Sequence, residues 1–207
     1  MDFLKKQLQI LSLFICLTPF ALFAQNEKAI EAFSQSYVYE KNGEYSKAVE
    51  TLKAIYDPNS YEINLRLGWL NYSAGLFTES AAYYNKAVTL MPYAIEPKLG
   101  LVLPLSASGK TDDMINQYRQ ILDIDPKNTL ANYRMGAIYY GKEDFTTAYK
   151  YLEKGINLYP FDYDYILLFA WTNYKLGKYR EAKVLFYKAL LNRPTDKSAK
   201  EGYDLIK

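Results

Sequence analysis

Five prolines stand 34 residues apart along this 207-residue chain. They are Pro58, Pro92, Pro126, Pro160 and Pro194. Other landmarks share the period, because Gly75 returns as Gly109 and again as Gly177. A fixed period of this length indicates a stacked array, in which each copy is one small unit and neighbouring copies share a core. The chain is therefore predicted to be a repeat protein.

Each period contains two blocks of apolar residues at helical spacing, separated by a short turn. The turns are predicted at Asn42-Gly43, Ala74-Gly75, Ser108-Gly109, Lys142-Glu143 and Leu176-Gly177. The second helices are predicted to begin near Tyr45, Phe77, Asp112, Phe145 and Tyr179. Each should end before the proline, which cannot continue a helix. One unit is thus a pair of antiparallel helices, and the predicted fold is all-α.

The residues resemble the tetratricopeptide repeat (TPR) family. Numbering a unit from 1, that family favours a small residue at position 8, glycine at 15, an aromatic residue at 17, alanine at 20 and proline at 32. Units starting at Tyr61, Ile95, Thr129 and Tyr163 fit this frame without a gap. A first unit starts at Ala29, but its Pro58 comes two residues early, so its second helix should be shorter.

The resemblance implies a right-handed superhelical solenoid of five helix-turn-helix repeats followed by a C-terminal capping helix. The repeats are expected over about residues 29–60, 61–94, 95–128, 129–162 and 163–196, and the cap over 197–207. Repeat 3 carries Pro104 in the middle of its first helix, where proline costs roughly 3 kcal/mol. Two interpretations stay open: a kink that neighbouring helices absorb, or a kink that shapes a groove.

Residues 1–24 have the order of a secretory signal peptide. Lys5 and Lys6 precede an apolar run that ends at Ala24, and polar residues follow. We expect cleavage after Ala24, a mature domain over 25–207 and a periplasmic location. The alternatives are an uncleaved signal that tethers the chain to the membrane, or a lipid on Cys16, which the large Ile15 before it disfavours.

The composition argues against an enzyme. The chain has no histidine, and its one cysteine lies in the segment expected to be removed. Histidine and cysteine build most triads, dyads and zinc sites. We therefore predict no catalytic residue, no cofactor and no metal, although a carboxylate pair could in principle hydrolyse a glycoside.

Charge is unevenly distributed between the two ends of the chain. Residues 25–174 carry 14 Lys or Arg against 18 Asp or Glu, a net of −4, whereas residues 175–207 carry 9 against 4, a net of +5. The basic end either meets an acidic partner or an anionic surface, or is simply a solvated face. No basic run with interleaved aromatic residues indicates nucleic-acid binding.

In the TPR family, ligands contact the first helices of the repeats along a concave groove. The resemblance implies groove residues at Tyr37, Arg66, Trp69, Tyr72, Leu103, Ser106, Tyr133, Arg134, Tyr140, Trp171 and Tyr174. Exposed aromatic residues provide large contact areas with little loss of entropy. The alternative is that several of these aromatic side chains pack against the adjacent helix.

The sequence predicts a non-enzymatic exported scaffold that holds a peptide segment or protein partner of the cell envelope in this groove. The alternative is an envelope glycan-binding protein, because tryptophan and tyrosine faces also stack on sugars. Acids and amides beside the aromatic residues would favour the glycan. The Lys, Asn and Arg clamp for peptide carboxylates found in one TPR subfamily is absent. Those positions hold Phe33, Ser34 and Tyr37 in the first repeat and Leu65, Arg66 and Trp69 in the second.

Overall fold

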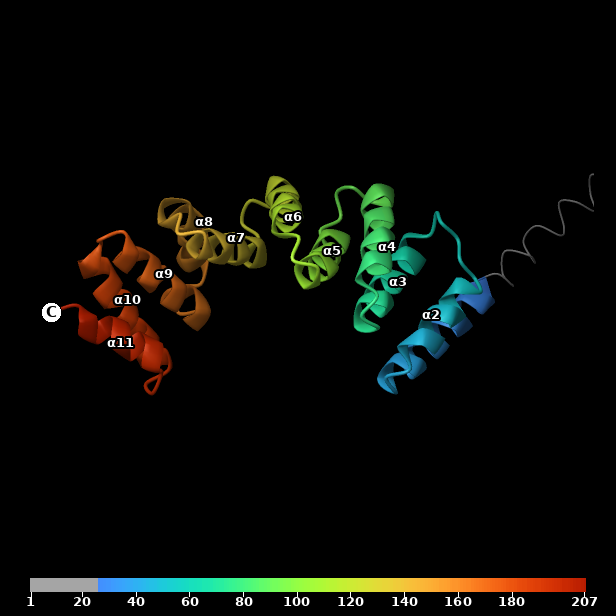
Figure 1. Ribbon diagram of the computed structural model, residues 1–207, viewed down its shortest axis with the longest axis horizontal. Coiled ribbons are helices and arrows are strands. Elements are labelled where there is room, and N and C mark those ends of the chain that lie inside the picture. Colours follow the sequence, from blue (N-terminus) through green and yellow to red (C-terminus); the bar gives the residue numbers. More distant parts are fainter. Residues whose placement is uncertain (1–25) are drawn as a thin grey trace, which may run out of the picture. The chain divides into compact units, whose positions relative to one another are not determined.

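The computed structural model describes residues 26–207 (Figure 1). A first helix spans residues 26–41. It is followed by α2 (Tyr45–Lys53), α3 (Tyr61–Ser73), α4 (Phe77–Leu90), α5 (Glu96–Ala107), α6 (Thr111–Ile124), α7 (Thr129–Gly141), α8 (Phe145–Leu158), α9 (Tyr163–Lys175), α10 (Tyr179–Asn192) and α11 (Lys197–Leu205). The all-α prediction is confirmed, and the predicted signal peptide lies outside the described residues.

The helices alternate as the period predicts. First helices (residues 26–41, α3, α5, α7 and α9) alternate with second helices (α2, α4, α6, α8 and α10), and α11 follows at the place predicted for the cap. The helix α2 has 9 residues, whereas the other second helices have 14 each. The shorter second helix that the early Pro58 predicts is therefore present.

The turns inside the repeats need a backbone conformation that favours glycine. Gly75 and Gly177 have φ of 78° and 75°. Glu143 takes the corresponding place in repeat 4 and is held at φ 60°. A side chain in this left-handed region costs roughly 1–2 kcal/mol, so the Lys142-Glu143 turn keeps its shape at some cost in stability.

Polar residues just before the first helices fix where these helices begin. Ser60, Asn128 and Asp162 each accept a hydrogen bond from the backbone N–H three residues later, which satisfies a free donor of the first turn. The helix α5 lacks such a cap and instead carries Pro97 in its first turn, where a missing N–H costs little. It spans Glu96–Ala107 with Pro104 inside it.

The chain forms two compact units, which meet in sequence between Ser108 and Gly109. In the first unit, the core includes Leu52, Leu67 and Leu70. In the second unit, one core cluster gathers around Leu152, Ile166 and Phe169, and another gathers around Phe186. Each unit therefore has apolar cores of its own.

Small residues allow the paired helices to approach closely, as the repeat frame predicts. In repeat 2, the Ser80 hydroxyl donates to the Gly68 carbonyl at 2.7 Å, and a Cβ added at Gly68 would lie 2.8 Å from Tyr84 Cγ. In repeat 4, a Cβ at Gly136 would lie 2.5 Å from Leu152 Cγ. These distances leave no room for a larger residue without movement of the neighbouring helix.

A buried side chain at position 4 of three repeats binds the loop before its own helix. Asn64 donates to the Ser60 carbonyl at 2.7 Å, and Asn132 donates to the Asn128 carbonyl at 2.8 Å. In repeat 3 the donor is Lys98, whose ammonium bonds the Ala94 carbonyl at 3.1 Å. Burial lowers the pKa of Lys98.

Buried tyrosines predict that the protein loses stability at alkaline pH. Tyr165 is buried, its hydroxyl donates to the Thr129 carbonyl, and burial raises its pKa to about 12. Its pKa in the unfolded chain is about 10. The folded state therefore binds the hydroxyl proton of Tyr165 more tightly than the unfolded chain does. The contribution of the protonated hydroxyl to the free energy of unfolding is complete below pH about 10 and is lost as pH rises through about 12.

Urea melts across this range should show a falling free energy of unfolding, with a smaller fall in the Tyr165→Phe variant. Each unit of raised pKa corresponds to about 1.4 kcal/mol at full effect. A free energy of unfolding that stays constant from pH about 9 to about 12 would contradict the burial of these hydroxyls.

Candidate partner-binding face

The predicted groove residues belong to first helices in both units. The first unit contains Tyr37, Arg66, Trp69, Tyr72, Leu103 and Ser106, and the second contains Tyr133, Arg134, Tyr140, Trp171 and Tyr174. Some of these side chains are exposed to solvent, whereas others pack against neighbouring helices.

Arg66 is engaged inside the protein. Only 8% of its surface is exposed, and its guanidinium lies 3.8 Å from the centre of the Tyr37 ring. It also forms an ion pair with Glu40 at 2.6 Å and donates from Nε to the Ser36 hydroxyl at 3.3 Å. The residue that the sequence analysis predicted to contact ligand therefore connects α3 to the first helix.

Trp69 completes this cluster and still presents part of its ring to solvent. Its indole N–H donates to the Glu40 carboxylate, and its ring centre lies 5.9 Å from that of Tyr72. Burial raises the pKa of Glu40, but the hydrogen bonds from Trp69 and Arg66 outweigh this and lower it below its usual value. Glu40 thus stays ionised and orients the tryptophan.

Leu103 and Ser106 show no such contacts. Leu103 is half-buried, and Ser106 is exposed near the end of α5. Within the first unit, the aromatic surface is accordingly made by Tyr37, Trp69 and Tyr72.

The second unit has an open hollow of about 360 Å³ that contains two predicted residues, Tyr133 and Arg134. The other lining residues are Thr129, Leu130, Tyr159, Asp162, Asp164 and Tyr165. The rings of Tyr133 and Tyr165 meet edge to face with centres 5.2 Å apart, which fixes one wall. Leu130 and Tyr159 are large exposed apolar residues on the rim.

Two charges of opposite sign are available in this hollow. Arg134 and Asp164 are exposed, and neither takes part in an ion pair within residues 26–207. Asp162 is already used, because it accepts a hydrogen bond from the Tyr165 N–H at 3.0 Å. The hollow can therefore bind an apolar group, an anion at Arg134 and a hydrogen-bond donor at Asp164 at the same time.

Leu130 and Tyr159 were not predicted as site residues from the sequence. Leu130 stands at position 2 of its repeat, one of the positions that contact ligand in TPR proteins, so the frame could have identified it. Tyr159 lies just past α8, in the loop before α9, where the repeat frame gives no expectation.

Trp171 faces the end of the second unit and not the hollow. Its ring centre lies 4.8 Å from that of Phe186, and its indole N–H donates to the Ser198 hydroxyl at 2.9 Å. It therefore joins α9 to α10 and α11. Tyr174 packs edge to face against Trp171 at 5.7 Å, and Tyr140 packs against Phe145 at 5.3 Å.

A second hollow, of about 400 Å³, lies among α8, α9 and α10. It is lined by Tyr149, Phe169, Asn173, Arg180, Glu181, Val184 and Leu185. The Lys178 ammonium lies 3.8 Å from the centre of the Tyr149 ring, a cation–π contact beside this hollow. None of these residues was predicted as a site.

Two features are absent from residues 26–207. No cluster of three or more His, Cys, Asp or Glu side chains could hold a metal ion. No helix in this range has the length and apolar character needed to cross a bilayer.

Comparison with known proteins identifies the repeat. Residues 33–95 and residues 130–162 each match the tetratricopeptide repeat family. The chain contains TPRs. Among curated proteins, it is 26% identical over 175 residues to the TPR repeat-containing protein YpiA of Bacillus subtilis (strain 168). This match covers 82% of the chain but only 40% of YpiA, so the chain spans less than half of that relative.

Solved TPR structures share the fold. A tetratricopeptide repeat protein from Parabacteroides merdae ATCC 43184 superposes with a TM-score of 0.74 at 22% identity, over 87% of this chain and 72% of that one. YrrB, described as a TPR protein with an unusual peptide-binding site, gives 0.69 at 13% identity, over 86% and 94%. At these identities the likeness concerns the TPR fold alone.

Proposed function

We propose that this TPR protein is an exported, non-enzymatic scaffold that holds a peptide segment or protein partner on the first helices of its repeats. The hollow at Tyr133 and Arg134 is the observation that carries the proposal. It is open, it lies on α7 and at the start of α9, and it combines aromatic, aliphatic and charged groups. Binding sites in proteins have this composition.

The lining residues indicate the chemistry of the ligand. An apolar side chain fits between Leu130, Tyr133 and Tyr159, because rigid aromatic rings give contact area at low entropic cost. The Arg134 guanidinium can bind a carboxylate or a backbone carbonyl, and Asp164 can accept a hydrogen bond from a peptide N–H or a lysine. An extended peptide offers all of these groups.

The first unit offers a second contact surface for the same partner class. Trp69 and Tyr72 lie side by side, and the Glu40 carboxylate holds the tryptophan. Aromatic residues in fixed orientations are typical anchors of protein interfaces. The peptide-binding site of YrrB, which has the same fold, supports a peptide as the ligand here.

The glycan alternative is supported by one feature of the hollow. The carboxylate of Asp164 lines the same hollow as the rings of Tyr133 and Tyr159. Carboxylates next to aromatic faces can accept hydrogen bonds from hydroxyl groups of a sugar stacked on the ring. An envelope glycan is therefore the second candidate.

Export belongs to the same proposal and rests on residues 1–24. Their order of charged, apolar and small residues supports a secretory signal cleaved after Ala24. The protein is proposed to act in the periplasm, with membrane tethering as the alternative. Intact mass of the protein recovered from cells should correspond to a chain that begins at Gln25, and a mass that retains residues 1–24 would contradict cleavage.

A peptide-library selection tests the binding site directly. Peptides enriched on the wild-type protein should carry an aromatic or large aliphatic residue near an acidic one. Their affinity should fall at least about tenfold for Tyr133→Ala and for Arg134→Gln, as expected for interface anchors. Tyr93→Ala is the control, because Tyr93 is 84% exposed in the first unit and lines neither hollow.

Two outcomes would count against the peptide proposal. Equal binding of the enriched peptides to Tyr133→Ala and to wild type would exclude the hollow as the site. Failure to enrich any peptide, together with retention of the protein on immobilised envelope polysaccharide, would favour the glycan.

A further inference from the structure

One face of α10 exposes an unusual set of residues, which we call the outer stripe: Arg180, Val184, Tyr187 and Leu191. Their spacing of four, three and four residues places them on one side of the helix. Val184, Tyr187 and Leu191 are 53%, 52% and 56% exposed. An exposed row of large apolar side chains on a well-packed helix indicates an interaction surface.

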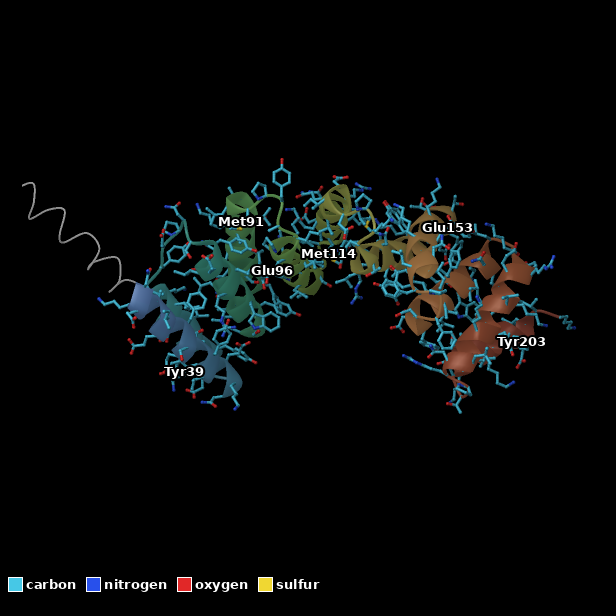
Figure 2. All side chains as sticks on the ribbon, turned by 180° about the vertical axis from the view of Figure 1, so that it is seen from behind. Tyr39, Met91, Glu96, Met114, Glu153 and Tyr203 are labelled. Carbon is cyan, nitrogen blue, oxygen red and sulfur yellow. The ribbon has the colours of Figure 1, made fainter. Side chains whose placement is uncertain are left out.

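The other repeats show that the fold does not require apolar residues at these places. Val184, Tyr187 and Leu191 correspond to Lys150, Glu153 and Asn157 on α8, and to Asn116, Arg119 and Asp123 on α6. Figure 2 shows the side chains of α8, with Glu153 labelled. Since these helices pack with polar residues at the same register, helix pairing within a repeat does not explain the apolar residues of α10.

Positive charges accompany the outer stripe on both sides. Arg180 lies within it, and Lys183 and Lys188 flank it by helical spacing. Neither Arg180 nor Lys188 joins any ion pair within residues 26–207, and segment 175–207 has a net charge of +5. The surface is thus apolar with a net positive charge, because Arg180, Lys183 and Lys188 outnumber Glu181, the one acidic residue on α10.

The helix α11 extends this surface. Tyr203, labelled in Figure 2, has its ring centre 6.5 Å from that of Tyr187. The Lys183 ammonium lies 5.0 Å from the Tyr203 ring and donates to the Ile206 carbonyl. Leu205 on α11 is also exposed. Two neighbouring helices therefore present tyrosine, aliphatic and lysine side chains together.

We propose that the outer stripe docks on an anionic phospholipid surface. Val184, Tyr187 and Leu191 would enter the headgroup region, with Arg180 and Lys188 facing the phosphates. Amphipathic helices with basic flanks bind membranes in this way, and tyrosine is enriched at that depth. The net positive charge beside this apolar row is complementary to an anionic lipid surface, which attracts basic residues by about 1 kcal/mol each.

The proposal is independent of the peptide site, because it concerns the second helix α10 and the cap, not the first helices α7 and α9. Contact with a membrane surface also requires no transmembrane segment. Attraction to anionic lipid depends on the number of basic residues at the surface, so both lipid charge and protein charge should control it.

Hydroxyl-radical footprinting of the full chain with lipid vesicles tests the proposal. Vesicles of phosphatidylglycerol should lower the oxidation rates of Tyr187 and Leu191 several-fold, while vesicles of phosphatidylcholine should leave them unchanged. Tyr93 in the first unit is an internal reference. The neutral vesicles also control for any insertion of residues 1–24, which would occur with both lipids.

Two double variants test the charged and the apolar parts of the outer stripe separately. Arg180→Gln with Lys188→Gln should raise the phosphatidylglycerol concentration needed for half protection about 30-fold. Val184→Asn with Leu191→Asn introduces the residues that α6 and α8 carry at these registers, so the fold should persist while protection is lost. Unprotected wild-type residues, or protection that neither variant changes, would overturn the proposal. Protection without lipid that rises with protein concentration would instead assign the stripe to a protein–protein contact.

Discussion

Replacing Trp171 with alanine is expected to lower the free energy of unfolding of the second unit by about 3 kcal/mol. The indole packs against Phe186 and donates a hydrogen bond to Ser198 on α11. Truncation leaves a cavity between α9 and α10 and removes the link to the capping helix. Urea melts should show the loss, and hydrogen exchange should show it concentrated in α10 and α11.

The matched control is Tyr159→Ala. Tyr159 is also aromatic but is 56% exposed, so its truncation should change stability by no more than about 0.5 kcal/mol. If Trp171→Ala behaved like Tyr159→Ala, the tryptophan would be a free surface residue, and the packing described for the cap would be wrong.

The second large effect is expected for Gly155→Ala in α8. A Cβ at this position would lie 2.0 Å from the Cε1 atom of Tyr165, a buried residue whose hydroxyl is bound to the Thr129 carbonyl. The ring cannot move without giving up this bond. Overpacking of this kind costs about 1–3 kcal/mol, and the upper end applies here because the neighbour is a fixed ring.

Gly141→Ala provides the control for this substitution. Gly141 is also helical, but a Cβ added there meets no heavy atom within 4 Å. Alanine favours helix over glycine by up to about 1 kcal/mol, so this variant should be as stable as wild type or slightly more stable. A lower thermal midpoint for Gly141→Ala than for Gly155→Ala would contradict the account of helix packing.

The repeat frame predicted the helices well because each landmark has a direct structural cause. Proline ends a helix, and a left-handed turn favours glycine, so the 34-residue period could be converted into helix boundaries. Even the shorter α2 follows from the early Pro58. At Glu143 the packing of the repeat outweighs the residue's own backbone preference, since this glutamate takes the left-handed conformation of the glycines at the same place in other repeats.

The site was harder to predict, because a repeat position does not say which neighbour a side chain meets. Arg66 and Arg134 both stand at position 6, yet Arg66 is paired with Glu40 from the first helix of the preceding repeat, whereas Arg134 is exposed. The two arginines differ because Arg66 has an acidic partner within reach, whereas Arg134 forms no ion pair within residues 26–207. Trp171 likewise occupies a groove position but meets Ser198, because α11 supplies a partner there. The preferred residues of one repeat do not say which side chains of neighbouring repeats will contact each other.

Photo-crosslinking in cells tests the central claim, that the hollow on α7 and α9 holds a peptide. A photoreactive residue would replace Leu130, which lines the hollow, and the control would replace Lys150, which is exposed on α8. Mass spectrometry should identify defined peptide adducts at position 130 that are absent at position 150 and that Arg134→Gln reduces at least about tenfold. Identical adducts at both positions, or adducts that Arg134→Gln does not reduce, would contradict the claim.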